Sequence, residues 1–366
     1  MIRRIIALVV KELQEQLRTP RSAAMLFVPV IIQTLILPFA ATMDVTHCKA
    51  AILNEDAGSL GSELVQRLRA APCMSETFIV YGREELMALI ESRSALIGVH
   101  IPSDFSRRAQ RGEAADVQII SDGRRANSSQ IAAGYAASIV SSMGAEAVEG
   151  SGDKTAPVTR HLYNPALDYK WFILPCLIGM LGMLTSFNIT AMALAREREE
   201  GTYEQLCVTP MSPFEILLGK IIPALVIVTA QTAVIAAISR WGYGLPFTGS
   251  LPALFSSVML YCLALGGVGF ALSSFCNTQQ QAFVAMFCVI LPFILLSGFL
   301  APAENMPTVL QTAARADPLY YMFIIVRGIF LKGFGFAEIA PHLAALAAIA
   351  LLSLAAAYTA LRLRRS

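Results

Sequence analysis

Cysteines and histidines are the residues of this sequence that could bind a metal ion or act as nucleophile and base. There are seven cysteines and four histidines among the 366 residues. The cysteines form no C-x-x-C pair, and the sequence contains no H-E-x-x-H or G-x-S-x-G motif. The histidines are dispersed as His47, His100, His161 and His342. This pattern predicts no metal site and no catalytic residues, so we do not expect an enzyme.

A nucleotide-binding loop is also missing from the sequence. The P-loop needs G-x-x-x-x-G-K followed by Ser or Thr, because its backbone holds phosphates and its hydroxyl binds Mg²⁺. The Gly219-Lys220 pair is followed by Ile221, and Phe214 stands at the position of the first glycine. We therefore expect no cofactor in this chain.

Two cysteines, Cys48 and Cys73, lie in a long polar segment that the topology described below would export. An oxidising compartment would permit a disulfide between them. Because connectivity cannot be deduced from sequence, a disulfide and two free thiols both stay open.

Charged residues of both signs crowd together just after a long apolar stretch, from Arg196 to Glu204. Gly201 is expected to end the preceding helix. Thr202, with Gln205 three residues later, has the spacing of a capping box that would begin a short helix. Such a charge run has two explanations, a solvated flank of a membrane helix or a docking surface for another protein.

The short helix predicted after Gly201 must end before the next apolar stretch. Pro210 stops it, and Pro213 fits the first turn of the following helix. We expect a short helix parallel to the membrane, projecting between two membrane spans.

The elements that position this loop follow from composition. The chain is 55% hydrophobic and 15% charged, whereas soluble domains have about 25% charged residues. The net charge of +2, without a basic tract, predicts no nucleic-acid partner. Spanning a bilayer takes about 20 apolar residues. Six stretches qualify: 23–41, 171–195, 216–238, 251–275, 282–300 and 341–361. The predicted fold class is an α-helical polytopic membrane protein of six transmembrane helices with an inserted extracytoplasmic α/β domain.

Basic residues beside the spans set the predicted orientation, because Lys and Arg accumulate on the cytoplasmic side. They flank the first span, the loop after the second span, and the end of the sixth, so both termini are expected in the cytoplasm. The predicted divisions are a cytoplasmic amphipathic helix at 1–21, the first transmembrane helix at 22–42, a periplasmic α/β domain at 43–170, and transmembrane helices two to six at 171–366.

The exported segment alternates short β-type runs with helical ones. Strands are predicted at 50–53, 77–81, 96–101 and 117–120, and helices at 60–70, 83–92, 102–111 and 127–148. Residues 152–169 are expected to return, extended, to the membrane. About a hundred residues are enough for a domain that folds by itself.

Two helical segments are predicted at the membrane surface. Residues 1–16 carry Ile2, Ile6 and Leu13 at helical spacing opposite charged residues, which fits a helix on a membrane face or one packed on a protein. The apolar run at about 318–332, which contains Arg327, is too short to cross. An interfacial or re-entrant helix is expected there, with Arg327 reaching an outer headgroup or an acidic partner such as Glu304 or Asp317; a seventh span is the alternative.

Polar residues inside the spans are candidates for a substrate pathway because they are costly in lipid. They include Gln33, Asn188, Gln231 and Ser297, which could equally join helices by hydrogen bonds. No Asp, Glu, Lys or Arg is expected at mid-membrane depth, which favours an external energy source over ion coupling. The small-residue runs 179–182 and 265–269 could pack between subunits or within one.

The stretch E-R-E-E-G-T-Y-E-Q-L-C-V-T-P-M-S-P-F-E, residues 197–215, resembles the hallmark loop of ABC-2 type permeases. Further likeness lies in Tyr163-Asn164-Pro165, 296–299, 305–307 and 327–333. The match implies that a coupling helix at about 196–215 docks on a separate ABC ATPase subunit. By this resemblance the residues that couple to the ATPase are Arg196, Glu197, Glu199, Glu200, Gly201, Thr202, Glu204, Gln205, Leu206, Pro210 and Pro213.

The resemblance also implies function and partners. The chain would be the permease of an ATP-driven exporter in the bacterial inner membrane, moving a lipophilic small molecule or drug. ATP and Mg would sit on the ATPase, and a second permease subunit would complete a homodimer or heterodimer. A periplasmic adaptor and an outer-membrane channel stay open as further partners. The alternative is a membrane receptor with a periplasmic sensing domain and a cytoplasmic docking loop.

Overall fold

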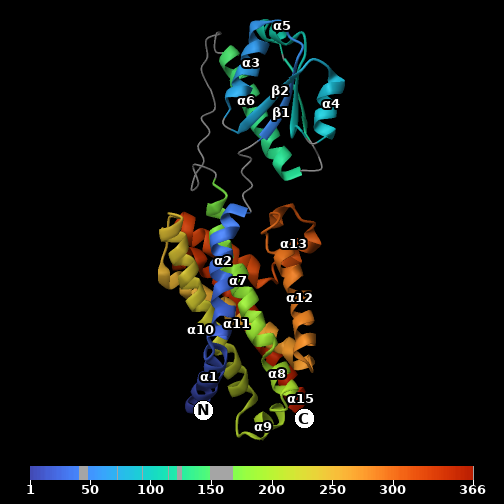
Figure 1. The fold of residues 1–366 in the computed structure, drawn as a ribbon. Helices are drawn as coiled ribbons and strands as arrows, with labels where there is room; N and C mark the ends of the chain where they lie inside the picture. Colours follow the sequence, from blue (N-terminus) through green and yellow to red (C-terminus); the bar gives the residue numbers. More distant parts are fainter. Residues whose placement is uncertain are drawn as a thin grey trace. The chain divides into compact units, whose positions relative to one another are not determined.

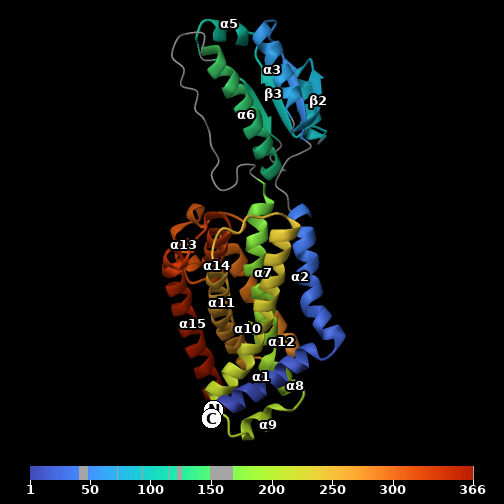
Figure 2. The ribbon, with the colours of Figure 1, turned by 90° about the vertical axis from the view of Figure 1, so that its left-hand side faces the viewer.

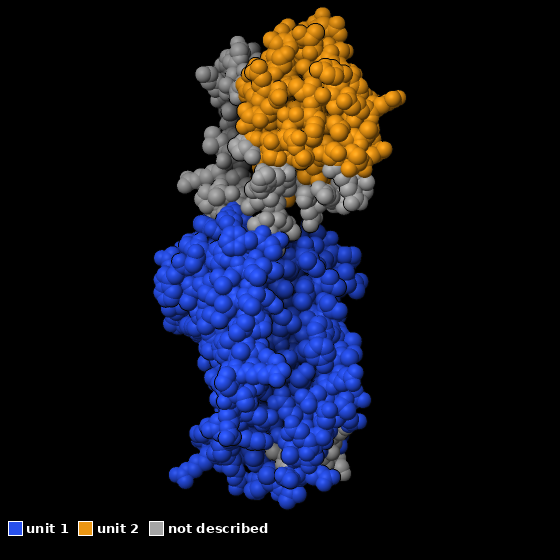
Figure 3. All heavy atoms as spheres, in the orientation of Figure 1, with its two compact units in different colours: residues 1–40, 162–366 blue, residues 41–161 orange. Residues whose placement is uncertain are grey.

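A computed structural model of the chain describes residues 1–40, 48–71, 73–92, 94–113, 115–121, 126–148 and 168–365. The chain divides into two compact units, coloured separately in Figure 3. The helical unit joins Met1–Ala40 to Leu162–Ser366, and the α/β unit is Ala41–His161. The predicted extended return at 152–169 falls almost wholly outside the described residues.

The α/β unit alternates strands and helices along the chain. Its elements are β1 (Cys48–Asn54), α3 (Ser59–Ala70), β2 (Met74–Val80), α4 (Arg83–Glu91), β3 (Ile97–Ile101), α5 (Phe105–Gln110), β4 (Gln118–Ser121) and α6 (Ala126–Val148). All four predicted strands and four predicted helices are present. The helix predicted from Pro102 begins at Phe105 instead. Residues 102–105 form a turn, in which the Phe105 N–H donates to the Pro102 carbonyl at 3.1 Å.

The four strands form one sheet in the order β2-β1-β3-β4. Strand β1 is parallel to both β2 and β3, and β4 is antiparallel to β3. Residues Ala50 to Leu53 of β1 are all buried, since helices cover both faces of the sheet. Leu64 and Leu68 of α3 pack on one face, and Leu86 of α4 packs on the other (Figure 1).

The helical unit holds the apolar spans. Its elements are α1 (Ile2–Leu17), α2 (Pro20–Ala40), α7 (Lys170–Ala191), α8 (Ala193–Glu199), α9 (Tyr203–Val208), α10 (Pro213–Ala237), the π-helix η3 (Ile238–Gly242), α11 (Leu251–Phe275), α12 (Gln279–Leu296), the 3-10 helix η4 (Ala303–Asn305), α13 (Thr308–Ala314), α14 (Pro318–Arg327), the π-helix η5 (Gly328–Lys332) and α15 (Phe336–Arg365).

Among the described residues, six helical segments are long and apolar enough to cross a membrane, as predicted. They are α2, α7 with α8, α10 with η3, α11, α12 and α15. Both chain termini lie at the same end of the helical unit as α1 and α9 (Figures 1 and 2). We call this the terminal end and the opposite end, beside α13, the distal end.

Helix α11 packs against α7, α10 and α15 through its glycines. A Cβ atom at Gly266 would lie 2.7 Å from a side-chain carbon of Ile221 in α10, and one at Gly267 would lie 2.7 Å from the Ser353 backbone of α15. The small residues of this run therefore permit close approach inside one subunit. The run 265–269 thus packs within the protomer, which is one of the two arrangements considered for it.

Helix α14 with η5 is buried inside the helical unit. Leu319, Met322 and Phe323 are fully buried, and the Thr248 hydroxyl of the α10–α11 loop donates to the Phe330 carbonyl of η5 at 3.1 Å. The start of α14 packs on Gly179, nine residues inside α7, so the segment rises along α7 toward the distal end; an interfacial or re-entrant setting in a membrane stays a prediction. The expected acidic partner of Arg327 is wrong: the guanidinium lies over the Phe172 ring, 5.2 Å from its centroid, and donates to the Phe323 carbonyl.

Candidate functional site

The segment from Arg196 to Pro213 forms a short hairpin at the terminal end of the helical unit. Helix α8 ends at Glu199, and Gly201 takes a left-handed backbone conformation with φ of +73° that favours glycine. Helix α9 follows. Helix α10 then begins at Pro213, where the Ser212 hydroxyl accepts from the Glu215 backbone N–H at 3.3 Å. The Glu215 carboxylate accepts from the Ser212 N–H at 2.7 Å, completing a capping box.

The capping box predicted at Thr202 and Gln205 is therefore wrong. The Thr202 hydroxyl caps nothing in α9; it donates instead to the Glu197 carboxylate and to the Glu197 carbonyl. The same S/T-x-x-E/Q pattern, about three helical turns later at Ser212-Pro213-Phe214-Glu215, is the capping box in the structure. Thr202 holds the hairpin closed, and Ser212 starts the helix that leaves it.

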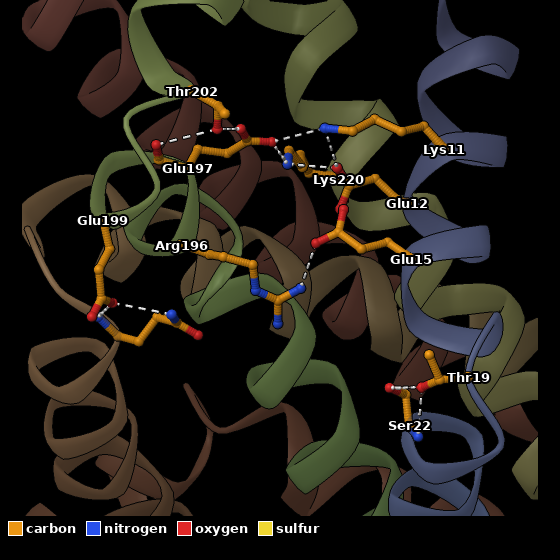
Figure 4. A network of polar contacts seen from close by, with 11 residues as sticks. Lys11, Glu12, Glu15, Thr19, Ser22, Arg196, Glu197, Glu199, Thr202 and Lys220 are labelled. Atoms are coloured by element: carbon orange, nitrogen blue, oxygen red, sulfur yellow. Dashed lines mark hydrogen bonds and ion pairs between the residues drawn. The ribbon is translucent and has the colours of Figure 1, made fainter.

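Three charged side chains are buried together behind the hairpin (Figure 4). The Lys220 ammonium donates to the Glu12 carboxylate of α1 at 2.6 Å and to the Glu197 carboxylate of α8 at 2.7 Å. Lys220, Glu12 and Glu197 are only 3%, 5% and 6% exposed. Buried charges are tolerated when they are paired and hydrogen-bonded. These hydrogen bonds link α1, α8 and α10. We call Glu12, Glu197 and Lys220 the buried triad.

Lys11 and Arg196 surround the triad at its solvent side. The Lys11 ammonium lies 3.3 Å from the Glu197 carboxylate, and the Arg196 guanidinium donates to Glu15 of α1 at 3.0 Å. Burial alone lowers the pKa of Lys11, but the carboxylates of Glu197 and Glu12 outweigh it and leave that pKa above its ordinary value. Lys11 therefore stays charged and balances the second carboxylate of the triad.

The opposite side of α8 is fastened to the turn between α11 and α12. The Arg198 guanidinium donates to the carbonyls of Ser274 and Cys276 at 3.1 and 2.5 Å, which satisfies acceptors at the end of α11. The Glu199 carboxylate accepts from the backbone and side-chain N–H groups of Gln279, both at 3.0 Å. Helix α8 is thus bonded to α1 and α10 on one side and to α11 and α12 on the other.

Helix α9 presents its polar surface outward. Glu200, Glu204, Gln205 and Pro210 are exposed, and Val208 is 85% exposed. Leu206 lies in α9, but its side chain is outside the described residues. The predicted coupling residues therefore divide into two groups. Arg196, Glu197, Glu199 and Thr202 bond inward to the helical unit. Glu200, Glu204 and Gln205 are exposed, and Gly201, Pro210 and Pro213 shape the backbone.

A groove of 640 Å³ separates α1 from the hairpin. Arg4, Leu8 and Lys11 line it from α1, and Gln205 and Pro210 line it from the hairpin. The Arg4 guanidinium crosses it to donate to the Pro210 carbonyl at 2.5 Å. Helix α1 packs on α10 where the Leu8 side chain covers Gly219.

The face of α1 that is turned away from this contact leaves Ile2, Ile6 and Val10 exposed. A stripe of exposed apolar residues beside basic ones is typical of a helix in a membrane surface. One face of α1 thus packs on α10 of the same chain, and the position of its exposed face on a membrane stays a prediction.

The four candidate pathway residues separate in the structure. Gln33 of α2 and Asn188 of α7 are exposed and line one cleft of 390 Å³. Gln231 is buried and donates to the Leu26 carbonyl of α2 at 2.9 Å, and the Ser297 hydroxyl donates to the Ile294 carbonyl at 2.7 Å. Gln231 and Ser297 make structural hydrogen bonds, while Gln33 and Asn188 are left facing a cavity.

The α/β unit holds the two cysteines considered for a disulfide. The Cys48 backbone N–H donates to the Cys73 carbonyl at 2.9 Å, and both thiols are free. Burial, with a smaller contribution from Cys73, raises the pKa of the Cys48 thiol to about 11. The two residues are neighbours, so their oxidation to a disulfide stays a prediction. Within the described residues, no three His, Cys, Asp or Glu side chains gather to hold a metal ion.

Two residues of the triad were not identified as functional from the sequence. By sequence alone, Glu12 is one of the charged residues of the amphipathic helix 1–16, and Lys220 is one of the basic residues in the loop after the second span. One signal was present: Glu12 falls one turn after Leu8, on the face that packs against α10. An acidic residue on a buried helix face requires a basic partner.

Comparisons with known proteins identify the family of the chain. The profile of the ABC-2 family transporter proteins matches residues 22–359, so the chain belongs to that family and is a multi-pass membrane permease. It is 41% identical over 334 residues to the probable multidrug ABC transporter permease YbhR of Escherichia coli K12, covering 91% of each chain. The predicted family is therefore confirmed.

Two further relatives from the same organism are more distant. The probable multidrug ABC transporter permease YbhS is 29% identical over 337 residues, 90% of this chain and 89% of its own length. The inner membrane transport permease YhhJ is 29% identical over 272 residues, 73% of this chain and 72% of its own.

Proposed function

We propose that the chain is the membrane subunit of an ATP-driven exporter and that a separate ABC ATPase docks on the exposed surface of α9. The observation that carries the proposal is the asymmetry of the hairpin. Its base, α8, is bonded through Glu197, Arg198 and Glu199 to four other helices, whereas Gln205 and Val208 of α9 face outward. A surface that is free outside and rigidly bonded inside can transmit force.

The terminal end of the helical unit would lie in the cytoplasm, where an ATPase is found. Supporting this orientation, Arg3, Arg4, Arg18 and Arg21 gather around α1 and the start of α2 at that end. Six spans then leave both termini inside and the α/β unit outside, in the periplasm of a cell that has one.

Transport would follow a two-state scheme. ATP and Mg, bound by the partner, would draw two ATPases together, and each would carry its docked α9 with it. Because Glu197 bonds to Lys220 of α10 and Arg198 bonds to the end of α11, movement of α9 would shift α1, α10 and α11 together. The chain itself supplies no nucleotide site; it converts the approach of the ATPases into rearrangement of the spans.

Partners and substrate follow from the same proposal. A second permease subunit would complete the pathway, and a periplasmic adaptor with an outer-membrane channel could extend it from the α/β unit. The relatives YbhR and YbhS are named as probable multidrug permeases, which supports export of lipophilic small molecules.

The test uses the complex purified from its own host membrane with its ATPase. Val208→Glu should weaken retention of the ATPase by about tenfold or more, because it buries an added negative charge where the exposed Val208 side chain of α9 would contact the ATPase. Val309→Glu on α13 is the matched control, since Val309 is 77% exposed at the distal end. Equal ATPase retention in the two variants would refute docking on α9.

A further inference from the structure

The cleft between α2 and α7 contains polar groups that the described part of the protein does not satisfy. Its volume, 390 Å³, is within the range of sites for small molecules. Its polar lining is Gln16, Ser22, Gln33, Thr185, Asn188 and Arg196. Met25, Leu26, Pro29 and Leu181 are among its apolar walls. The cleft runs along α2 from Ser22 to Gln33, about 16 Å of helix.

The amides of Gln33 and Asn188 have no hydrogen-bond partner among the described residues. Both belong to helices that cross the membrane, where no bulk water replaces a missing partner. A polar group in such a place is costly unless it is hydrogen-bonded, so both amides are suited to bond the polar groups of a molecule that enters the cleft.

The wall beside these amides offers further hydrogen-bonding atoms. Pro29 has no N–H group, so the carbonyl of Met25 receives no helical hydrogen bond from it. Behind Leu26, the Gln231 side chain donates to the Leu26 carbonyl while its own oxygen has no partner in the described structure. Donors and acceptors therefore lie together along an apolar wall.

The positive charge of Arg196 at the terminal end of the cleft favours ligands with an oxygen acceptor or a negative charge. Arg196 is the one charged residue among those that line it, and one nitrogen of its guanidinium is used by Glu15. A guanidinium has five N–H donors, so others can meet a ligand oxygen. A permanent cation placed there would instead meet the like charge of Arg196, which the carboxylate of Glu15 offsets only from its other side.

We propose that this cleft is the substrate-binding site of the permease and that it takes neutral or anionic amphiphiles, with the polar end toward Arg196 and hydrogen-bonding groups at Gln33 and Asn188. The proposal rests on the proposed transport function. The apolar body of the ligand packs on Leu26, Pro29 and Leu181, and the ligand enters from the membrane leaflet at the terminal end.

The test measures binding of three fluorescent probes to the whole complex with its ATPase, in lipid nanodiscs without ATP. The probes share one chain: dansylaminoundecanoate, its methyl ester, and the trimethylammonium analogue. The carboxylate and the ester should bind more tightly than the ammonium. Gln33→Leu combined with Asn188→Leu should raise the Kd of the carboxylate about tenfold or more, since two hydrogen bonds are lost.

Thr229→Val is the matched control, because it removes a hydroxyl from α10 that bonds its own helix and does not line the cleft. Its Kd should equal that of the wild type. If the double variant does not assemble, Gln33→Cys and Asn188→Cys are used singly. The carboxylate should then protect both introduced thiols from labelling by a maleimide. Mass spectrometry measures the labelled fraction.

An unchanged Kd in the double variant, or tighter binding of the ammonium, overturns the assignment of the cleft. If the wild-type complex still retains its ATPase, the proposed function is unaffected by that result. The Gln33→Cys variant tests a second occupant. If the introduced thiols of two subunits form a disulfide and the carboxylate does not protect them, a second permease fills the cleft, and this result also overturns the assignment. Loss of ATPase from the wild-type complex would instead count against the proposed function.

Discussion

Replacing Lys220 by methionine should detach α1 from the rest of the terminal end. The Lys220 ammonium donates hydrogen bonds to both Glu12 and Glu197, and its side chain is 2% exposed. Methionine keeps the length of the stem and removes the charge. The two carboxylates then lie buried near each other, and Lys11, whose side chain is 57% exposed, is the cation left within 4 Å of both.

The magnitude follows from the burial of the two acids. Breaking a buried ion pair by removing one partner destabilises a protein by roughly 3–5 kcal/mol, because a buried charge is left without compensation. Lys11 offsets part of this for Glu197, at 3.3 Å, and less for Glu12, at 3.9 Å. We therefore expect a loss near the lower limit, about 3 kcal/mol.

The assay measures the free energy of opening the terminal end in mixed micelles. Opening is monitored by the rate at which a maleimide labels a cysteine placed at Leu8. Leu8 is 8% exposed where it covers Gly219, so labelling reports whether α1 stays packed. Lys220→Met should label about a hundredfold faster than the wild-type background, which is the population change that about 3 kcal/mol produces.

Two controls separate charge from packing. Lys11→Met removes an exposed cation and should change stability by at most about 1 kcal/mol. Lys220→Met with Glu12→Met removes one charge of each sign and should recover most of the loss, since an apolar pair can replace a buried ion pair. If Lys220→Met behaves like Lys11→Met, the triad does not hold α1 and the reasoning is wrong.

Three other predictions concern separate parts of the chain. Burial raises the pKa of Asp317 to about 8, so the folded state holds this proton more tightly than the unfolded chain. The stability that this group contributes is therefore lost as the pH rises from about 4 to about 8. Asp317→Asn should remove this pH dependence from the melting temperature. Gly267→Ala should destabilise the helical unit by about 1–3 kcal/mol in denaturant titrations, whereas Gly144→Ala, where nothing lies within 4 Å, should not destabilise the α/β unit. A membrane-impermeant maleimide should label Ser121→Cys on intact cells and Val208→Cys only after permeabilisation; equal labelling of both on intact cells would refute the orientation.

The spans and the α/β elements could be predicted because their signals are local. Apolar length alone identified α11 with the bounds Leu251–Phe275. Helix ends were less accurate. Helix α10 begins at Pro213 rather than Ile216, because the capping box of Ser212 and Glu215 adds a turn that has little hydrophobic signal.

The triad could not be predicted because its members are far apart in the sequence. Glu12 and Lys220 are separated by 208 positions, and periodicity describes neighbours within one element. Each charge had an ordinary local explanation, the polar face of α1 for one and a basic flank for the other. The packing of Leu8 on Gly219 brings α1 close to α10, where the pair forms.

The candidate pathway residues show the same limit. Gln33 and Gln231 are both glutamines within apolar helices, and sequence gives them equal weight. In the structure Gln231 is 1% exposed and bonds a backbone carbonyl of the neighbouring helix, whereas Gln33 faces a cleft. What distinguishes them is the spacing of α2 and α7, a tertiary property.

The most direct test of ATPase docking on α9 is site-specific photo-cross-linking in intact membranes. Benzoylphenylalanine is placed at Val208 on α9 and, in a second strain, at Val309 on α13, two positions of similar exposure at opposite ends of the helical unit. The proposed function predicts that position 208 cross-links to a protein with a P-loop and that position 309 does not. A cross-link at 208 to a protein without a nucleotide-binding motif, or a cross-link to the ATPase from 309 alone, would contradict it.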